Sequence, residues 1–222
     1  MESKQFVVIG LGRFGYSVAT TLFELGNDVL AIDKNEDIVQ DIADEVTHAV
    51  VMDATDEFAL KKLGIRNFDV AVVTIGDDIQ SSIMITLLLK ELGIKYIVAK
   101  GHNDLHEKVL KKIGADKVVL PEKDMGKRVA HNLVSSNILD YIELSKDYTI
   151  MEIEAIDEWK NKSLLELNLR SKYKINVMAI KRNGEINISP MADEKIMDKD
   201  ILVAIGNNND INKLEILMAK SK

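Results

Sequence analysis

The sequence contains no cysteine among its 222 residues, which excludes disulfide bonds, thiolate zinc sites and cysteine nucleophiles. Long apolar runs are missing too. The longest, residues 83–89, includes Thr86 and is far shorter than the roughly 20 residues that a membrane-spanning helix needs. These absences fit a protein of the reducing cytoplasm with no direct membrane insertion, so that any membrane role must go through a partner.

An excess of positive charge is also absent. The formal net charge is −7, and no block of Lys or Arg interrupts the acidic balance. Nucleic-acid binding depends on clustered Lys and Arg side chains that neutralise phosphates. The composition therefore predicts no nucleic-acid partner.

Two kinds of segment alternate regularly over residues 1 to about 122. The β-branched runs are residues 6–10, 28–33, 48–53, 69–76, 95–100 and 117–122. The helical patterns between them are Tyr16–Leu25, Glu36–Val46, Glu57–Leu63, Ile79–Leu92 and Leu105–Ile113. Strand runs without polar alternation suit a parallel sheet covered by helices on both faces. The pattern predicts an α/β domain with a Rossmann-like, doubly wound parallel sheet.

The pattern changes after Glu122. Apolar residues at close to helical spacing are Met125, Val129, Leu133, Ile138 and Tyr141, which predict one long or broken helix. From residue 148 onward, alternating strands, a helix over residues 164–173, a hairpin turn at Asn183-Gly184 and a closing helix predict a small α+β unit. We therefore expect a nucleotide-binding domain at 1–123, a connecting helical segment at 124–142 and a C-terminal ligand-binding domain at 143–222.

A Gly-x-Gly-x-x-Gly motif follows the first strand and opens the first helix. Its glycines, Gly10, Gly12 and Gly15, permit a tight turn, close approach of a phosphate and close packing of helix against strand. The helix that starts near Phe14 offers free N–H groups to an anion. Asp33 ends the second strand, where a carboxylate binds ribose hydroxyls and repels the 2′-phosphate of NADP. The motif predicts a dinucleotide or nucleotide site.

Further residues are expected at the same edge of the sheet, because the carboxyl ends of parallel strands gather there. They are Asp53, Ala54, Thr55, Gly76, Lys100 and Glu122. Asp53 and Thr55 are candidates to border the adenosine. Asp56 and Asp78 are better interpreted as helix caps, which is a routine role of Asp.

The chemistry of a catalyst is not evident in the sequence. No nucleophile, histidine and acid occur in an arrangement that predicts catalysis, although an NAD-dependent oxidoreductase is the alternative that the glycine motif leaves open. His102 and His106 are spaced i, i+4 and could bind a metal. Residues 101–108 are more typical of a helix start that is capped by Asn103 or Asp104, with His106 on a solvent-facing side.

Several segments together resemble a known family. They are FVVIGLGRFG (6–15), VLAID (29–33), LGIRNFD (63–69), IGDDIQSSIMITLLLKELG (75–93) and KIGADKVVLPEKDM (112–125). With the small terminal unit, they are similar to the cytosolic regulatory subunits of bacterial Ktr potassium uptake systems, which have RCK (TrkA-like) N-terminal and C-terminal domains. The resemblance covers essentially the whole chain.

The resemblance implies a regulator that is not an enzyme. In this family the N-terminal domain binds ATP or ADP, and in some members NAD(H). Homodimers assemble to an octameric ring beneath a membrane subunit that conducts potassium. Arg13 matches an arginine that reaches the terminal phosphates of ATP, and Asp33 matches the ribose-binding acid. Glu122 matches a glutamate near the γ-phosphate, where a divalent cation or sodium can bridge carboxylate and phosphate.

The resemblance also implies a second ligand, cyclic di-AMP, at a dimer interface of the C-terminal domain. Arg170 and Asn176 are the candidates for phosphate contacts. Ile175, Ile188 and Pro190 are the candidates to pack against adenine. The alternative is that Arg170 is an ordinary surface residue of a helix and that the isoleucines belong to the core.

Overall fold

The computed structural model describes residues 3–134 and 138–220. The chain divides into two compact units, residues 1–121 and 122–222. The more detailed division at residues 123 and 142 stays a prediction. Each unit has its own sheet and its own core, and they are treated in turn.

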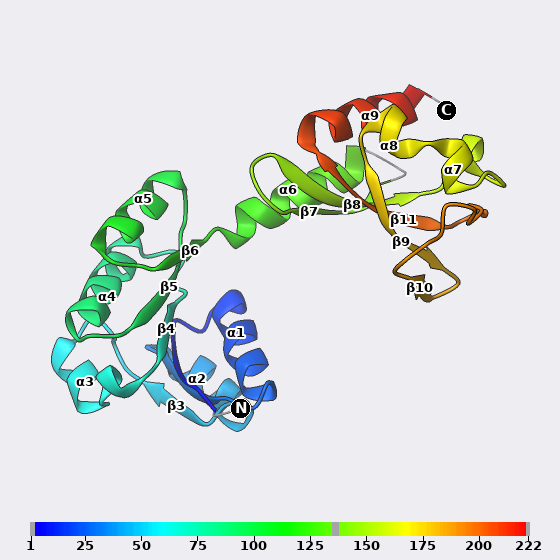
Figure 1. Cartoon of the computed structure of the whole chain (residues 1–222). Helices are drawn as coiled ribbons and strands as arrows, with labels where there is room; N and C mark the ends of the chain where they lie inside the picture. Colours follow the sequence, from blue (N-terminus) through cyan, green and yellow to red (C-terminus); the bar gives the residue numbers. More distant parts are fainter. Residues whose placement is uncertain (1–2, 135–137, 221–222) are drawn as a thin grey trace. The chain divides into compact units, whose positions relative to one another are not determined.

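The first unit alternates strands and helices (Figure 1). The strands are β1 (Gln5–Ile9), β2 (Asp28–Asp33), β3 (His48–Val51), β4 (Val70–Val73), β5 (Tyr96–Lys100) and β6 (Lys117–Val119). The helices are α1 (Arg13–Glu24), α2 (Glu36–Ile42), α3 (Glu57–Lys62), α4 (Ile79–Glu91) and α5 (Asp104–Ile113), with 3₁₀ turns η1 (Ala43–Glu45) and η2 (Ile65–Asn67). All neighbouring strands pair in parallel, in the order β3-β2-β1-β4-β5-β6. This confirms the predicted doubly wound sheet.

Helices cover the two faces of this sheet because successive strand residues point to opposite sides. Val7 and Ile9 of β1 pack in one core with side chains of α3, α4 and α5. Val8, which lies between them, packs in a second core with side chains of α1 and α2. The continuous apolar runs of the central strands β1, β2 and β4 are therefore buried on both faces of the sheet.

The second unit is built on an antiparallel sheet. Its elements are α6 (Pro121–Val134), β7 (Ile138–Glu143), β8 (Tyr148–Glu154), η3 (Asp157–Trp159), α7 (Leu164–Leu167), α8 (Leu169–Tyr173), β9 (Asn176–Arg182), β10 (Glu185–Asn187), β11 (Ile201–Asn207) and α9 (Asn208–Lys220). The sheet order is β10-β9-β11-β8-β7. Asn183 and Gly184 both have positive φ, at 51° and 85°, as the predicted hairpin turn requires. The α+β prediction is confirmed.

Two of the predicted helices are different in the structure. The helix expected to run from Met125 to Tyr141 ends at Val134, and Ile138–Glu143 is a strand that pairs with β8. Residues 135–137 lie outside the described residues. The helix expected over 164–173 is divided into α7 and α8 at Asn168, whose φ of 44° interrupts the helical backbone.

Ion pairs hold α6 beside β7 within the second unit. Arg128 donates from Nε and Nη2 to the two carboxylate oxygens of Asp140, at 2.6 and 2.5 Å. This guanidinium holds the pKa of the Asp140 carboxyl below its usual range. Lys127 and Glu143 form a longer pair at 3.7 Å. Because strand pairing and these contacts act together, the segment after α6 is a strand despite its helical spacing.

Candidate functional site

The glycine turn between β1 and α1 has the geometry that the motif predicts. Gly10 has a φ of 93°, and a Cβ there would lie 2.9 Å from Cγ1 of Ile75. A Cβ at Gly15 would lie 1.9 Å from the carbonyl oxygen of Gly10, so only glycine allows α1 to pack this closely. The buried Thr74, the residue after β4, donates its hydroxyl to the Gly10 carbonyl and fixes the turn. Sequence reasoning missed this residue.

Gly12 differs from the other two glycines because a Cβ there would meet nothing within 4 Å. Gly12 is the N-cap of α1, and no side chain among the described residues caps this helix. By contrast, Asn or Asp side chains cap the starts of α2, α3, α4 and α5. The first N–H groups of α1 have no partner within the helix, so they remain available for an anion that approaches over Gly12.

A hollow of about 460 Å³ lies at the carboxyl ends of β1, β2, β3 and β4. It brings together the predicted residues Gly10, Gly12, Asp33, Asp53, Ala54, Thr55 and Gly76. Further lining residues not predicted from the sequence include Ile32, Lys34, Ile38, Met52, Asp77 and Ser81. Ile38 and Met52 add apolar wall beside the ribose acid, which suits a planar base. Their apolar character alone did not distinguish them from core residues.

Asp33 is held firmly at the rim of this hollow. Its Oδ2 accepts from the backbone N–H of Leu11 at 2.6 Å, and its Oδ1 accepts from the N–H of Asn35 at 2.9 Å. Each carboxylate oxygen has a second lone pair for a hydroxyl group. The first contact joins the ribose acid to the glycine turn, so the two parts of the predicted site are positioned together.

Asp53 and Thr55 form a local turn after β3. Oδ1 of Asp53 accepts from the backbone N–H and the hydroxyl of Thr55, at 2.9 and 2.7 Å, and these bonds hold the pKa of the Asp53 carboxyl below its usual range. Asp56 caps α3 and Asp78 caps α4, as expected. The cap residue Asp78 also lines the hollow.

Five predicted residues are not among those that line the hollow, and Gly15, which packs against the Gly10 carbonyl, is one of them. Arg13 is the first residue of α1 and its side chain is exposed. Phe14 lies on another hollow, of about 840 Å³, on the face of the sheet that carries α1. The Lys100 ammonium lies 3.2 Å from the position of a Cβ on Gly76, beside the site. Glu122 lies in the first turn of α6, at the start of the second unit.

His106 is buried, at 3% exposure, so its predicted position on a solvent-facing side is wrong. Its Nδ1 accepts from the backbone N–H of His102 at 3.2 Å, and burial lowers the pKa of the imidazole. Asn103 caps α5 through the N–H of His106, as expected. Across residues 3–134 and 138–220, no three His, Asp or Glu side chains gather into a metal site.

In the second unit, Arg170 and Asn176 line one surface hollow of about 430 Å³. Ile175 is 1% exposed and packs in the core, which corrects its expected contact with a ligand. The reason is that its side chain fills the space over Gly206, where a Cβ would lie 2.9 Å from Ile175 Cγ2. Ile188 is 77% exposed and Pro190 is half-buried, and neither lines this hollow.

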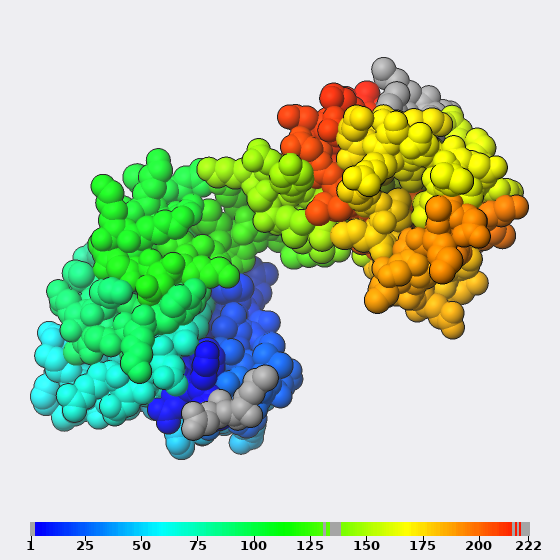
Figure 2. Space-filling model, in the orientation of Figure 1, coloured from blue at the N-terminus to red at the C-terminus, as the bar shows by residue number. Residues whose placement is uncertain are grey.

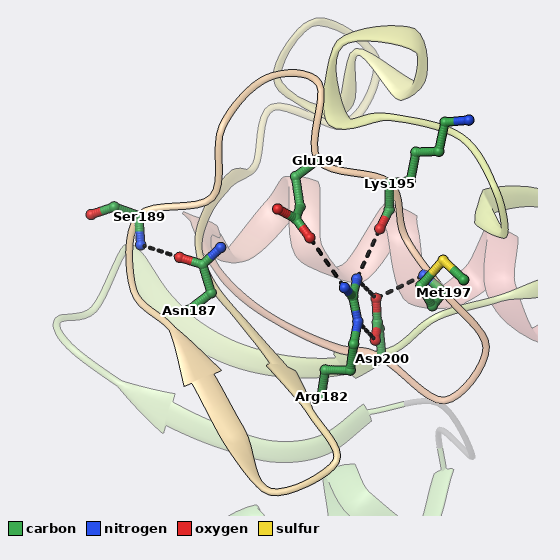
Figure 3. Close-up of polar contacts among 7 residues, drawn as sticks. All are labelled: Arg182, Asn187, Ser189, Glu194, Lys195, Met197 and Asp200. Carbon is green, nitrogen blue, oxygen red and sulfur yellow. Dashed lines mark hydrogen bonds and ion pairs between the residues drawn. The ribbon is translucent and has the colours of Figure 1, made fainter.

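Ile188 and Pro190 belong to a loop, residues 188–200, at the surface of the second unit (orange in Figure 2). Arg182 of β9 anchors its end by bonds to Asp200, Glu194 and the Lys195 carbonyl (Figure 3). Asp200 is fully buried and also accepts from the N–H of Met197 at 2.7 Å. This network holds the loop against the sheet.

The fold and the glycine turn define a Rossmann-like α/β unit joined to a small α+β unit. The TrkA-N domain family matches residues 6–121, and the TrkA-C domain family matches residues 149–218. Ktr system potassium uptake protein C of Bacillus subtilis is 53% identical over 212 residues, which cover 96% of each chain. Ktr system potassium uptake protein A of the same bacterium is 47% identical over 215 residues, or 97% of each.

Solved structures agree with this fold. The GsuK RCK domain matches with a TM-score of 0.67 and 16% identity, covering 98% of this chain and 48% of that one. A GsuK channel bound to NAD matches with a TM-score of 0.68 at 16% identity, over 98% of this chain and 40% of that one. The chain belongs to the Ktr family of RCK-type potassium uptake regulatory proteins, built from a TrkA-N and a TrkA-C domain. In the described residues, no helix combines the length and the apolar content needed to span a bilayer.

Proposed function

We propose that this protein is a nucleotide-sensing subunit that gates potassium uptake through a membrane Ktr partner, with ATP and ADP as opposing ligands and NAD(H) as a further one. The observation that carries the proposal is the uncapped start of α1, where Gly12 opens onto the hollow and Arg13 follows at once. The helix start and the glycine turn would bind the inner phosphates, with Asp33 on the ribose and Asp53, Ala54 and Thr55 beside the adenosine.

Arg13 supplies the discrimination between the two nucleotides. A guanidinium binds a terminal phosphate through charge-assisted, planar hydrogen bonds. A ligand shifts a conformational equilibrium only if it binds the two states differently. An arginine that gains a contact from the γ-phosphate meets that requirement, whereas a site for NAD alone does not need it.

Titration calorimetry with ATP and ADP tests this role. Arg13→Ala should weaken ATP by about 1–3 kcal/mol and ADP by clearly less. Arg66→Ala is the matched control, because Arg66 is an exposed arginine of the same unit that does not line the hollow. Equal losses for both nucleotides would leave Arg13 as a phosphate contact and refute sensing.

The alternative, an NAD-dependent oxidoreductase, differs in a measurable way. Thermal-shift ranking of ATP, ADP, NAD and NADP gives the ligand preference, and NADP should rank last because Asp33 repels a 2′-phosphate. We expect no turnover of NADH, since a regulator needs no catalytic acid or base. Turnover that depends on Asp33 would favour the enzyme.

We propose that the protein forms homodimers that assemble to an octameric ring at the cytoplasmic side of the membrane. The 840 Å³ hollow supports this assembly, because its lining is mainly apolar: Phe6, Phe14, Val18, Leu22, Val70, Val72, Tyr96, Val98 and Val119, together with the polar residues Ser3, Lys4, Asp69 and Lys95. An apolar sheet face of this kind is stabilised when a partner surface covers it. Light scattering of the purified protein and copurification with the membrane subunit test the two levels of assembly.

Two further ligands complete the proposal. A divalent cation or sodium would bridge Glu122 and the γ-phosphate of ATP, because a carboxylate repels a phosphate unless a cation lies between them.

Cyclic di-AMP would bind the second unit and inhibit uptake. The hollow that contains Arg170 and Asn176 supports this second site, since it supplies a cation and an amide for a phosphate.

A further inference from the structure

The 430 Å³ hollow of the second unit has a lining that suits an anion. Its lining residues are Asn168, Arg170, Ser171, Lys174 and Asn176. The segment that carries them, α8 and the start of β9, lies on the face of the unit seen in Figure 2 (yellow). None of the described residues in this lining is acidic, and two are cationic. Lys174 is the second cation. Neither its spacing nor its residue type identified it in the sequence as a residue that could bind a ligand.

The backbone at Lys174 is unusual. Lys174 ends α8 with a φ of 60°, in the left-handed region that side-chain-bearing residues other than Asn and Asp rarely adopt. The next residue, Ile175, is locked in the core over Gly206. Lys174 and Asn176 are exposed on either side of this anchor, and both line the hollow. The buried Ile175 thus fixes the backbone that presents them.

The charges in this segment are also locally unfavourable. Arg170 and Lys174 both line this hollow, so their like charges repel each other. In the part of the chain that the structure describes, neither side chain has an acidic partner within ion-pair distance. A bound anion with more than one charge would offset this repulsion, whereas an empty hollow leaves it in place.

Resting on the proposed binding of cyclic di-AMP, we propose that Lys174 is a second phosphate-binding cation beside Arg170, held there by its left-handed backbone. The two cations have different roles. The planar guanidinium of Arg170 can bind a phosphate through two parallel bonds, while the Lys174 ammonium adds charge from a compact donor. In a two-fold dimer each half of the symmetric dianion would meet the same pair of cations.

The decisive variant is Lys174→Asn in the full-length protein. Asn adopts the left-handed backbone more readily than Lys, so this change removes the charge without straining the fold. We expect the affinity for cyclic di-AMP to fall about tenfold, as for the loss of one charge-assisted hydrogen bond. The unfolding midpoint, followed by fluorescence of the single tryptophan, Trp159 in the core of the second unit, should stay equal or rise.

Lys172→Gln is the matched control, because Lys172 is an exposed lysine of α8 that does not line the hollow. It should change the affinity less than twofold, and Lys174→Arg should keep most of the binding. The affinity of the wild-type protein should also depend more steeply on salt than that of Lys174→Asn, since exposed charges are screened by ions.

The possible results separate this inference from the proposed function. If Arg170→Ala weakens cyclic di-AMP but Lys174→Asn does not, the role of Lys174 is refuted and the ligand assignment stands. Equal losses in Lys174→Asn and Lys172→Gln would show a general charge effect, which also refutes it. If the wild-type protein binds no cyclic di-AMP at micromolar concentration, the second-ligand proposal and this inference both fail.

Discussion

Arg182→Met should strongly destabilise the second unit, because it leaves a buried carboxylate without its partner. Arg182 donates to both oxygens of Asp200, at 2.8 and 2.7 Å, and Asp200 is fully buried. This carboxylate raises the pKa of the Arg182 guanidinium. Removing one partner of a buried pair costs about 3–5 kcal/mol.

That loss is a large share of a typical folding free energy of about 5–15 kcal/mol. Urea unfolding followed by Trp159 fluorescence measures it for the second unit alone, since the only tryptophan lies in that core. Lys181→Ala is the matched control. Lys181 precedes Arg182 on β9 and pairs with Glu152 in a partly exposed bridge, so its loss should cost about 0–1 kcal/mol.

A double variant identifies the cause. Arg182→Met with Asp200→Asn removes the buried charge together with its partner, and it should be more stable than Arg182→Met alone. If the double variant is as unstable as the single one, the uncompensated carboxylate is not the reason for the loss. In that case the bond from Arg182 to the Lys195 carbonyl would carry the stability of the loop.

Three other predictions concern the first unit and its ligands. Asp33→Asn should weaken ATP, ADP and NAD by similar factors in calorimetry, because Asp33 is assigned to the ribose that all three share; unchanged ADP binding would reject that assignment. Glu122→Gln should reduce the effect of magnesium or calcium on ATP affinity, and the bridge is excluded if neither ion affects the wild-type protein. The thermal midpoint of the first unit should fall as the pH drops below about 6.5. His106 has a lowered folded-state pKa, so the unfolded chain binds the proton more readily and the stability present above the unfolded pKa is lost in acid. His106→Gln should flatten that dependence, and an unchanged slope would contradict the role of His106.

The sequence predicted the first unit closely because its signals are local and mutually consistent. Each β-branched run became a strand of the parallel sheet, and the spacing of Gly10, Gly12 and Gly15 specified the turn. The lining of the hollow by Ile38 and Met52 could not be predicted, because an apolar residue in a site has the same pattern as one in the core. His106 is buried and its Nδ1 accepts from the backbone N–H of His102, which the i, i+4 spacing of the two residues does not reveal.

Prediction was weaker in the second unit because non-local contacts decide its structure. Ile138 and Tyr141 have helical spacing, yet pairing with β8 makes them part of a strand. Ile175 lies in the segment that the family resemblance relates to cyclic di-AMP, which made it a candidate ligand contact. It is instead a core residue, because Gly206 on β11 provides the space for its side chain. Gly206 lies 31 positions after Ile175, so the local sequence pattern around Ile175 could not indicate that this residue is buried.

The same non-local contacts predict at which residue the chain can be cut to give a stable second unit. A fragment of residues 143–222, which follows the boundary expected from the sequence, lacks almost all of β7. Its β8 would become an edge strand with unpaired backbone groups, which favours association with other chains. A fragment of residues 122–222 keeps β7 and the pair Arg128–Asp140.

We therefore expect the longer fragment to unfold at a higher urea concentration, measured by Trp159 fluorescence, and to aggregate less. Arg128→Met in the longer fragment separates the contribution of the ion pair from that of the strand. Equal midpoints and equal solubility of the two fragments would show that β7 is not an integral part of this unit, and that the boundary near residue 143 is the correct one.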